Sequence, residues 1–228
     1  MAGATELIRG SASTTAGFSI CHYEGDGTSS NSFAHLLSQA PEMIICKNLD
    51  AVYNWAVAWQ ATTDQATVYL DTTGATFSGS NQWKGSVPTS TLVYVGASSE
   101  TNSRPYQGDK IIAYCFHSVE GYSKVGSYEG NGNLDGTFVY TGFRPAFVMT
   151  KSVDSTSDWQ MFDNKRTGYN VDNYELEAND NAVEDTSTEF IDIVSNGFKN
   201  RDTTDPNVAE TYTYIAFAES PFKYSNAR

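Results

Sequence analysis

The side chains with the clearest potential for chemistry are Asn131, Asn133 and Asp135, which alternate along the chain and precede Gly136. Oxygen ligands at every second position, followed by glycine, are typical of the first half of a calcium-binding loop. The twelfth position of such a loop would be Gly142, where a bidentate glutamate is normally required. Because Asn and Asp beside Gly are also the commonest residues of hairpin turns, the segment predicts a turn, with a calcium site as the alternative.

The three histidines, His22, His35 and His117, do not form a metal-binding or catalytic pattern. A metal site on a strand needs ligands at a spacing such as i and i+2, and no two of these histidines are that close. A serine nucleophile would need a histidine base and an orienting carboxylate, and the elbow sequence Gly-x-Ser-x-Gly is absent. The sequence therefore predicts no cofactor and no nucleophilic active site.

Neighbouring carboxylates are the remaining catalytic candidates, since glycoside cleavage uses a pair of acidic side chains. The candidate pairs are Glu24 with Asp26 and Asp154 with Asp158. Glu24 returns later in the chain as Glu129, but Asp26 returns as Asn131, and this favours a turn over an acid and base pair. The acidic stretch 179–185 is a second calcium candidate, with a solvated loop as its alternative.

Four aromatic residues lie in turn-rich segments and have no counterpart elsewhere in the chain, namely Trp83, Tyr106, Tyr169 and Tyr174. We expect these four rings at the surface, where they can stack on carbohydrate or contact another protein. Trp55 and Trp159 belong to a repeated pattern instead, and we expect both in the core.

Composition excludes several classes of protein. The 228 residues carry 14 Lys and Arg against 27 Asp and Glu, a net charge of −13. Nucleic-acid binding needs many basic groups, so this balance argues against it. No apolar stretch approaches the length of a membrane span, and no secretory leader is visible, so membrane insertion is not expected. Cys21, Cys46 and Cys115 lie in apolar surroundings and predict buried free thiols.

Several sequence motifs occur twice in the chain, in the same order. The turn sequence YEGDG at residues 23–27 returns at 128–132 as YEGNG. Pro41, Lys47 and Trp55 return as Pro145, Lys151 and Trp159, each 104 residues later (159 − 55 = 104 for the tryptophans). A constant offset across a proline, a lysine and a tryptophan indicates that one structural unit is duplicated.

Short strands separated by turn residues are expected within each repeat. They cover residues 17–23, 42–48, 55–60, 67–70, 91–96 and 110–117, and then 138–140, 147–151, 158–163, 190–194 and 211–219. In the long acidic loop after residue 163, only 174–177 could add a strand. Residues 34–40 are the best helix candidate and are too short to form a stable one.

The predicted fold is therefore all-β, with two tandem, internally repeated antiparallel β-sandwich units of the jelly-roll type. Residues 1–16 are expected to be an N-terminal lead-in or tether with one short extended piece around residues 6–8. Residues 17–119 are expected to be the first repeat and 120–228 the second. The alternative is a single larger sandwich that both repeats build jointly.

Several segments resemble an uncharacterised β-rich module of tailed-phage proteins, namely residues 16–20, 23–27, 40–45, 112–116, 120–128 and 140–148. That module is frequent in marine phages, cyanophages among them, and often follows a concanavalin-like lectin domain in virion and tail-fibre proteins. No such domain precedes it in this sequence, so the resemblance carries over no carbohydrate-binding role. It implies a virion component, made in the host cytoplasm, and supplies no catalytic residues.

The leading expectation is a non-enzymatic structural protein exposed on a tailed-phage virion, as a tail-fibre or adhesion component or as a capsid decoration. Its expected partners are other virion proteins, further copies of the chain and a host surface glycan. The alternatives are a glycan-binding module for host recognition, motivated by unpaired surface aromatics, and a polysaccharide-degrading enzyme, which a carboxylate pair in a groove would support.

Overall fold

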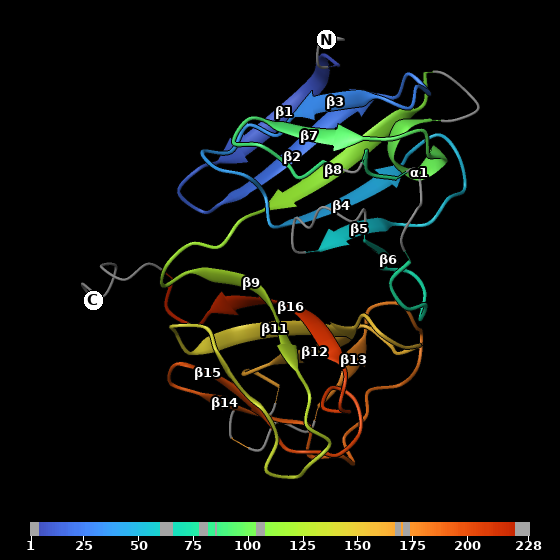
Figure 1. The fold of residues 1–228 in the computed structure, drawn as a ribbon. Helices are drawn as coiled ribbons and strands as arrows, with labels where there is room; N and C mark the ends of the chain where they lie inside the picture. Colours follow the sequence, from blue (N-terminus) through green and yellow to red (C-terminus); the bar gives the residue numbers. More distant parts are fainter. Residues whose placement is uncertain are drawn as a thin grey trace. The chain divides into compact units, whose positions relative to one another are not determined.

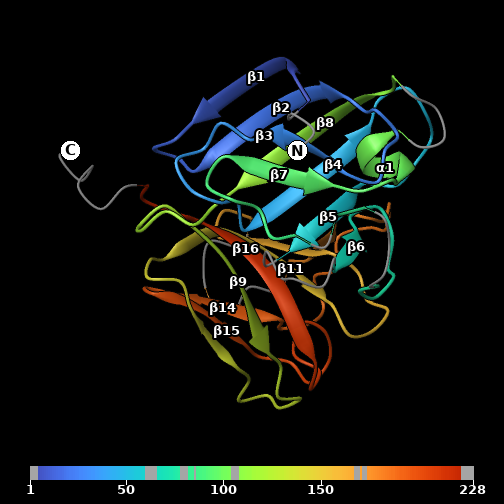
Figure 2. The same cartoon turned by 45° about the horizontal axis from the view of Figure 1, so that its top comes forward.

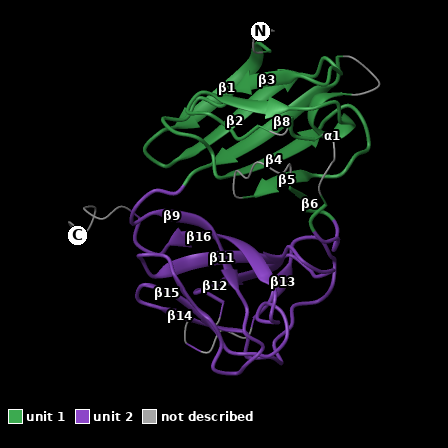
Figure 3. Ribbon diagram, viewed as in Figure 1, with its two compact units in different colours: residues 1–71, 76–117 green, residues 72–75, 118–228 purple. Residues whose placement is uncertain are grey.

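The fold is all-β, as predicted. The computed structural model describes residues 5–59, 66–77, 82–84, 86–103, 108–166, 170 and 174–221. These residues form antiparallel sheets and one four-residue helix (Figure 1). Two compact units divide the chain, Met1–Asp71 with Thr76–His117, and Thr72–Ala75 with Ser118–Arg228 (Figure 3). In the described part of the chain, no helix has the length and apolarity needed to cross a membrane.

The first unit contains a six-stranded sheet with the order β1-β2-β8-β4-β5-β6 and a two-stranded sheet, β3-β7. Its elements are β1 (Leu7–Ser13), β2 (Phe18–Glu24), β3 (Asn31–Ala34), β4 (Met43–Asn48), β5 (Ala56–Trp59), β6 (Thr67–Tyr69), β7 (Leu92–Val95), α1 (Ser99–Asn102) and β8 (Lys110–Phe116).

The second unit contains a five-stranded sheet with the order β13-β12-β11-β16-β9 and a three-stranded sheet, β10-β15-β14. Its elements are β9 (Ser123–Glu129), β10 (Phe138–Tyr140), β11 (Pro145–Ser152), β12 (Gln160–Asp163), β13 (Leu176–Glu177), β14 (Ile191–Val194), β15 (Gly197–Asn200) and β16 (Thr211–Ala218).

The two units share a strand order. When β1 is left out, the large sheet of the first unit has the order β2-β8-β4-β5-β6, and the large sheet of the second unit has the order β9-β16-β11-β12-β13. In both sheets the five strands, ranked by their order along the chain, stand as first, fifth, second, third and fourth. The small sheets also correspond, because β3 pairs with β7 as β10 pairs with β15. This agreement supports the tandem repeat, which stays a prediction because strand order alone does not demonstrate duplication.

Alternating side chains explain why these segments are strands. In β2, burial alternates along the strand, with Ser19, Cys21 and Tyr23 facing inward and Glu24 exposed. Each unit has its own apolar core. The first core includes Phe33, Ile44, Trp83, Val95 and Ile111. The second includes Val148, Phe162, Ile191, Phe198 and Tyr212.

The three cysteines are free and buried, which confirms the prediction from their apolar surroundings. Cys21 of β2 and Cys46 of β4 both stand opposite Ala113 of β8, and Cys115 lies two residues further on the same strand. Alternation therefore places all three thiols on one inner face. Burial raises the pKa of the Cys46 thiol to about 12, so that thiol is protonated and unreactive at neutral pH.

Residues 1–16 are not simply a tether, because Leu7–Ser13 form β1 and pair along β2. The sequence predicted only a short extended piece around residues 6–8, because the small residues that follow show no apolar alternation. The division between the units falls at 117/118, close to the predicted 119/120, but residues 72–75 belong to the second unit. The strands β3 and β15 and most of β9 were also unforeseen, since turn residues precede or follow each of them. Residues 34–40 are not helical.

Candidate functional site

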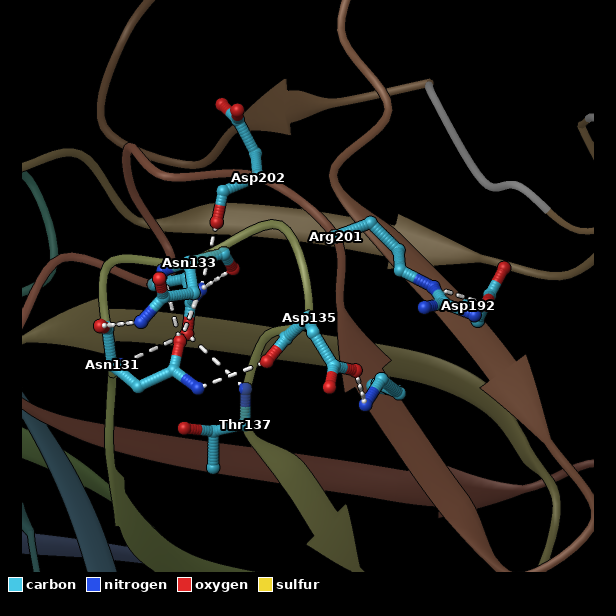
Figure 4. Close-up of polar contacts among 9 residues, drawn as sticks. Asn131, Asn133, Asp135, Thr137, Asp192, Arg201 and Asp202 are labelled. Atoms are coloured by element: carbon cyan, nitrogen blue, oxygen red, sulfur yellow. Dashed lines mark hydrogen bonds and ion pairs between the residues drawn. The ribbon is translucent and has the colours of Figure 1, made fainter.

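The loop between β9 and β10, residues 131–137, is held by a single buried side chain, Asn207. Its Oδ1 accepts hydrogen bonds from the amides of Asn131 (3.2 Å) and Thr137 (3.4 Å). Its Nδ2 donates to Asn131 Oδ1 (3.0 Å) and to the carbonyls of Asn133 (2.8 Å) and Asp202 (2.7 Å). Figure 4 shows the labelled loop residues gathered around these contacts. One amide group therefore ties the loop together.

The first unit has the same arrangement around Asn102, the last residue of α1. Asn102 is fully buried. Its Oδ1 accepts from the amide of Asp26 (3.1 Å), and its Nδ2 donates to Asp26 Oδ1 (3.0 Å) and to the carbonyl of Thr28 (2.8 Å). Asp26 thus occupies the role of Asn131, and Thr28 the role of Asn133.

A tyrosine completes each arrangement. The hydroxyl of Tyr23 donates to the carbonyl of Thr101 (2.5 Å), and the hydroxyl of Tyr128 donates to the carbonyl of Pro206 (2.8 Å). In each unit the accepting carbonyl belongs to the residue just before the key asparagine. The repeated YEGDG and YEGNG sequences are therefore structural latches; we call them the Asn102 latch and the Asn207 latch.

The predicted calcium ligands lie in the Asn207 latch. Asn131 Oδ1 accepts from the amide of Asn133 (3.0 Å) as well as from Asn207, and Asn131 Nδ2 donates to the carbonyl of Asp135 (3.0 Å). The carboxylate of Asp135 forms an ion pair with Lys199 (2.6 Å), whose hydrogen bond lowers the pKa of Asp135. The loop brings the three side chains together and directs their oxygens to protein donors, as a turn requires. Calcium binding stays a prediction.

An exposed aromatic pair lies at the end of this loop, on β10. Phe138 is 46% exposed and Tyr140 is 65% exposed, whereas Val139 between them points into the core. A Cβ atom on Gly197 would lie 3.2 Å from Phe138 Cε2, and one on Gly142 would lie 3.6 Å from the Tyr140 hydroxyl. Each ring thus rests beside a glycine, and we call the pair the β10 platform.

Charged groups flank the β10 platform. Lys199 stands opposite Phe138 across the sheet and opposite Asp192 on its other side. Arg201 binds Asp192 through Nε (2.5 Å), and Lys199 binds Asp135 (Figure 4). Two aromatic rings beside ordered polar groups can stack on a flat apolar face and donate hydrogen bonds at its rim. Neither Phe138 nor Tyr140 was selected from the sequence, where alternation alone does not tell which face of β10 points outward.

The four aromatic residues predicted at the surface have different outcomes. Trp83 is 5% exposed and packs in the first core, so its prediction was wrong. A bridge to Val95 of β7 places it inside the unit despite its turn-rich surroundings. Tyr174 is partly buried. Tyr106 and Tyr169 lie outside the described residues. Of the two tryptophans expected in the core, Trp159 is fully buried and Trp55 partly so.

Comparison with known proteins identifies a family. Residues 7–221 match the model of a family described as a domain of unknown function, DUF7483. The chain belongs to this family. No curated protein and no solved structure matches it. The description of DUF7483 names no activity.

In this DUF7483 member, His35 and His117 are buried and contact neighbouring segments of the first unit. His35 is fully buried, and its Nδ1 accepts from the amide of Leu37 (3.2 Å) while Nε2 lies 3.1 Å from the carbonyl of Thr89. Burial lowers the pKa of His35, which keeps it neutral. His117 contacts Gln39 through Nδ1 (2.9 Å). Among the described residues, no group of three or more His, Cys, Asp or Glu is placed to hold a metal ion.

Lys151 is fully buried, and burial lowers the pKa of its ammonium group to about 8. Its Nζ donates to the carbonyls of Ser152 (2.6 Å) and Ser155 (3.5 Å). The hydroxyls of these two serines donate instead to Glu210. Lys47, the repeated counterpart, bonds the carbonyl of Tyr53 in the same way. Both lysines therefore hold the loop after a central strand.

The carboxylates proposed as catalytic pairs also hold loops. Asp26 accepts from the amide of Thr28 (2.9 Å), and Asp154 accepts from the amide of Thr211 (2.7 Å). Asp158 accepts from the amide nitrogen of the Asn179 side chain (2.7 Å). These hydrogen bonds give Asp26, Asp154 and Asp158 a structural role in turns and loops.

Among the described residues, Glu175 is the one buried acidic side chain with a shifted pKa. It is 7% exposed, its Oε1 has no hydrogen-bond partner in the described structure, and Gln160 bonds its carboxyl group. Burial raises its pKa from 4.5 to about 7, and the negative charges of Glu177, Asp185 and Asp158 add to the shift. The folded protein therefore favours the neutral carboxyl group.

Glu175→Gln is expected to stabilise the protein at high pH. Because the folded-state pKa is raised, the neutral form contributes stability below pH 4.5, and this contribution is lost as pH rises through about 7. Above that value the variant should be more stable than the wild type by about 1–3 kcal/mol. Urea unfolding at both ends of the range measures the difference. Glu177→Gln, at a more exposed position, is the control; equal effects of both variants would contradict a special role for Glu175.

Proposed function

We propose that this protein is a non-enzymatic structural protein exposed on the particle of a tailed phage, as a tail-fibre or adhesion component or as a capsid decoration. The resemblance of its repeated motifs to a phage virion module supports the proposal. The observation that carries it is the use of the polar residues: Asn102, Asn207, Lys151 and the loop carboxylates all hold the scaffold together. What the described surface offers is the aromatic β10 platform.

Mass spectrometry of purified virions, followed by imaging of intact particles, tests this proposal. We expect the chain in purified particles in a fixed ratio to the major virion proteins. Density at the tail would indicate adhesion, whereas a position that follows the capsid lattice would indicate decoration. Absence of the chain from purified particles would overturn the proposal.

Glycan binding at the β10 platform is the second candidate function. Exposed rings of Phe138 and Tyr140, with Gly197 and Gly142 beside them, offer the flat apolar faces on which sugar rings stack. The Lys199 and Arg201 ion pairs supply charged hydrogen-bonding groups next to them. This observation favours a carbohydrate over a small charged ligand, because aromatic area dominates the platform.

Tyr140→Ala is expected to weaken glycan binding about fivefold, since loss of one stacking ring costs on the order of 1 kcal/mol. Tyr140→Phe is the matched control, because it keeps the ring and removes the hydroxyl. A glycan array with and without calcium, followed by calorimetry on the hits, measures both variants. A blank array under both conditions would exclude this function, and equal loss in the two variants would exclude stacking.

A further inference from the structure

Exposed sheet edges present unpaired backbone groups to which another strand can add, and proteins usually shorten or cover them. In the described residues of both units, most edges follow this rule. The strands β6, β10 and β13 have three residues or fewer. The strand β3 is bridged by Thr5, and β7 is bridged by Trp83.

Two longer edges are covered by side chains that imitate a backbone partner. On β9, the Ser118 hydroxyl donates to the carbonyl of Val125 (3.4 Å) and accepts from its amide (3.0 Å). On β14, Asn170 Nδ2 donates to the carbonyl of Ile193 (2.9 Å), and Asn170 Oδ1 accepts from its amide (2.9 Å). Each side chain occupies the groups that a further strand would need.

Within the part of the chain that the structure describes, the edge strand β1 has neither protection. It is seven residues long, six of them are exposed, and β2 is its one partner among the described strands (Figure 2). The carbonyl of Gly17 bonds the amide of His117, beyond the end of β8, so the odd-numbered residues of β2 bond β8 and the even-numbered ones bond β1. Gly10 and Ala12 stand opposite odd-numbered residues, and their amides and carbonyls therefore point away from β2.

We propose that β1 is a homodimerisation edge, to which β1 of a second copy adds in antiparallel orientation across a twofold axis. The two six-stranded sheets then join into one continuous sheet. A twofold contact requires a self-complementary patch, and an antiparallel strand pair is one of the simplest. This interface does not depend on the proposed virion function.

The sequence of β1 suits pairing with itself. Arg9 is its one charged residue, and an antiparallel register centred on Gly10 or on Ser11 places Arg9 opposite Ser11 or Ser13 of the second copy. Neither register sets like charges opposite each other, which would be destabilising. The remaining side chains are small or apolar, and the strand contains no proline, lysine or acidic residue to prevent addition.

Apolar side chains beside β1 also favour a second copy of the chain as the partner of this edge. Ile8 is 44% exposed and Leu36 is 42% exposed. Leu36 lies over β1, because a Cβ atom on Gly10 would come within 2.4 Å of its Cδ1. Strand addition by a second copy would bring both apolar groups of each copy toward the shared axis and remove apolar surface from water.

Sedimentation velocity of the full chain and of Ala12→Pro tests the proposal. We expect a wild-type dimer and a monomeric variant, because proline removes an outward amide and places its ring where the second strand would bind. Pairing of β1 with β2 should persist, since that amide does not bond β2. Ala12→Val keeps the amide and should stay dimeric. Circular dichroism and the thermal midpoint establish that each variant is folded.

Disulfide trapping gives an independent measurement that does not depend on how the proline variant folds. Ser11→Cys should cross-link two copies under mild oxidation, because residue 11 lies at or next to the proposed axis. Val52→Cys, at a fully exposed position of the same unit, should remain unlinked. A monomeric wild type, or an oligomer that Ala12→Pro leaves intact and Ser11→Cys does not trap, would overturn the proposal.

Discussion

Gly130→Ala is expected to destabilise the second unit by about 3 kcal/mol or more, among the largest effects of any single substitution in this chain. A Cβ atom at this position would lie 2.0 Å from the carbonyl oxygen of Val208 and 2.8 Å from the carbonyl of Asn207. Both neighbours are backbone atoms, so relief would require the Asn207 latch to open. Denaturant unfolding, with amide exchange to locate the loss, measures the effect.

Gly132→Ala is the matched control for Gly130→Ala, because it changes the same loop two residues away. A Cβ atom at Gly132 meets nothing within 4 Å, but its φ of +63° is unfavourable for alanine. We expect a cost of about 1 kcal/mol from this backbone strain alone. If the two variants lost the same stability, the close approach of the latch would not be the reason for glycine at position 130.

Asn207→Ala is expected to cost about 3 kcal/mol or more, because it removes a buried side chain that bonds four backbone groups, all in part-buried hydrogen bonds. The amides of Asn131 and Thr137 lose an acceptor, and the carbonyls of Asn133 and Asp202 lose a donor. Hydrogen exchange should show faster opening of the loop and of the ends of β9 and β10.

Two control variants test whether the effect of Asn207→Ala comes from its own latch and is confined to the second unit. Asn133→Ala removes an exposed side chain that bonds only the Asn131 carbonyl, and should cost less than about 1 kcal/mol. Asn102→Ala should reproduce the loss in the first unit, where exchange of β2 and β8 would rise instead. Equal acceleration of exchange in both units by either variant would contradict the independent latches described above.

The sequence predicted the central strands well, because their physical signal is local. The apolar runs of β4 and β11 and the alternation of β2 require burial whatever their neighbours are. Of β1, only a short extended piece around residues 6–8 was predicted, because an exposed edge strand needs no apolar pattern. Trp83 was misplaced because a single bridge to Val95, 12 residues away (95 − 83 = 12), decides its position.

The latches could have been found from the sequence. Tyr23 and Tyr128 are 105 residues apart (128 − 23 = 105), and so are Asn102 and Asn207 (207 − 102 = 105). The offset used for the strands was 104, so these asparagines did not align with the repeat. The offset changes twice. The first unit has one additional residue between the turn and the proline that follows it (41 − 23 = 18 against 145 − 128 = 17), and the second unit has one additional residue between the repeated tryptophan and the asparagine (207 − 159 = 48 against 102 − 55 = 47). A search that allowed both insertions would have paired the asparagines.

The β10 platform was not predicted, since an aromatic residue in a short strand has no sequence mark that separates an inward from an outward ring. Only the burial of Val139 fixes the direction of Phe138 and Tyr140.

The Ser118 hydroxyl has a practical consequence for anyone who wishes to prepare the C-terminal half by itself. A fragment that starts after this serine would lose the group that occupies Val125, and its first strand would then be free to capture another molecule. A fragment that starts a few residues earlier keeps Ser118 and its hydrogen bonds to Val125. Aggregation of the shorter fragment, and good behaviour of the longer one, would therefore reflect a single missing side chain.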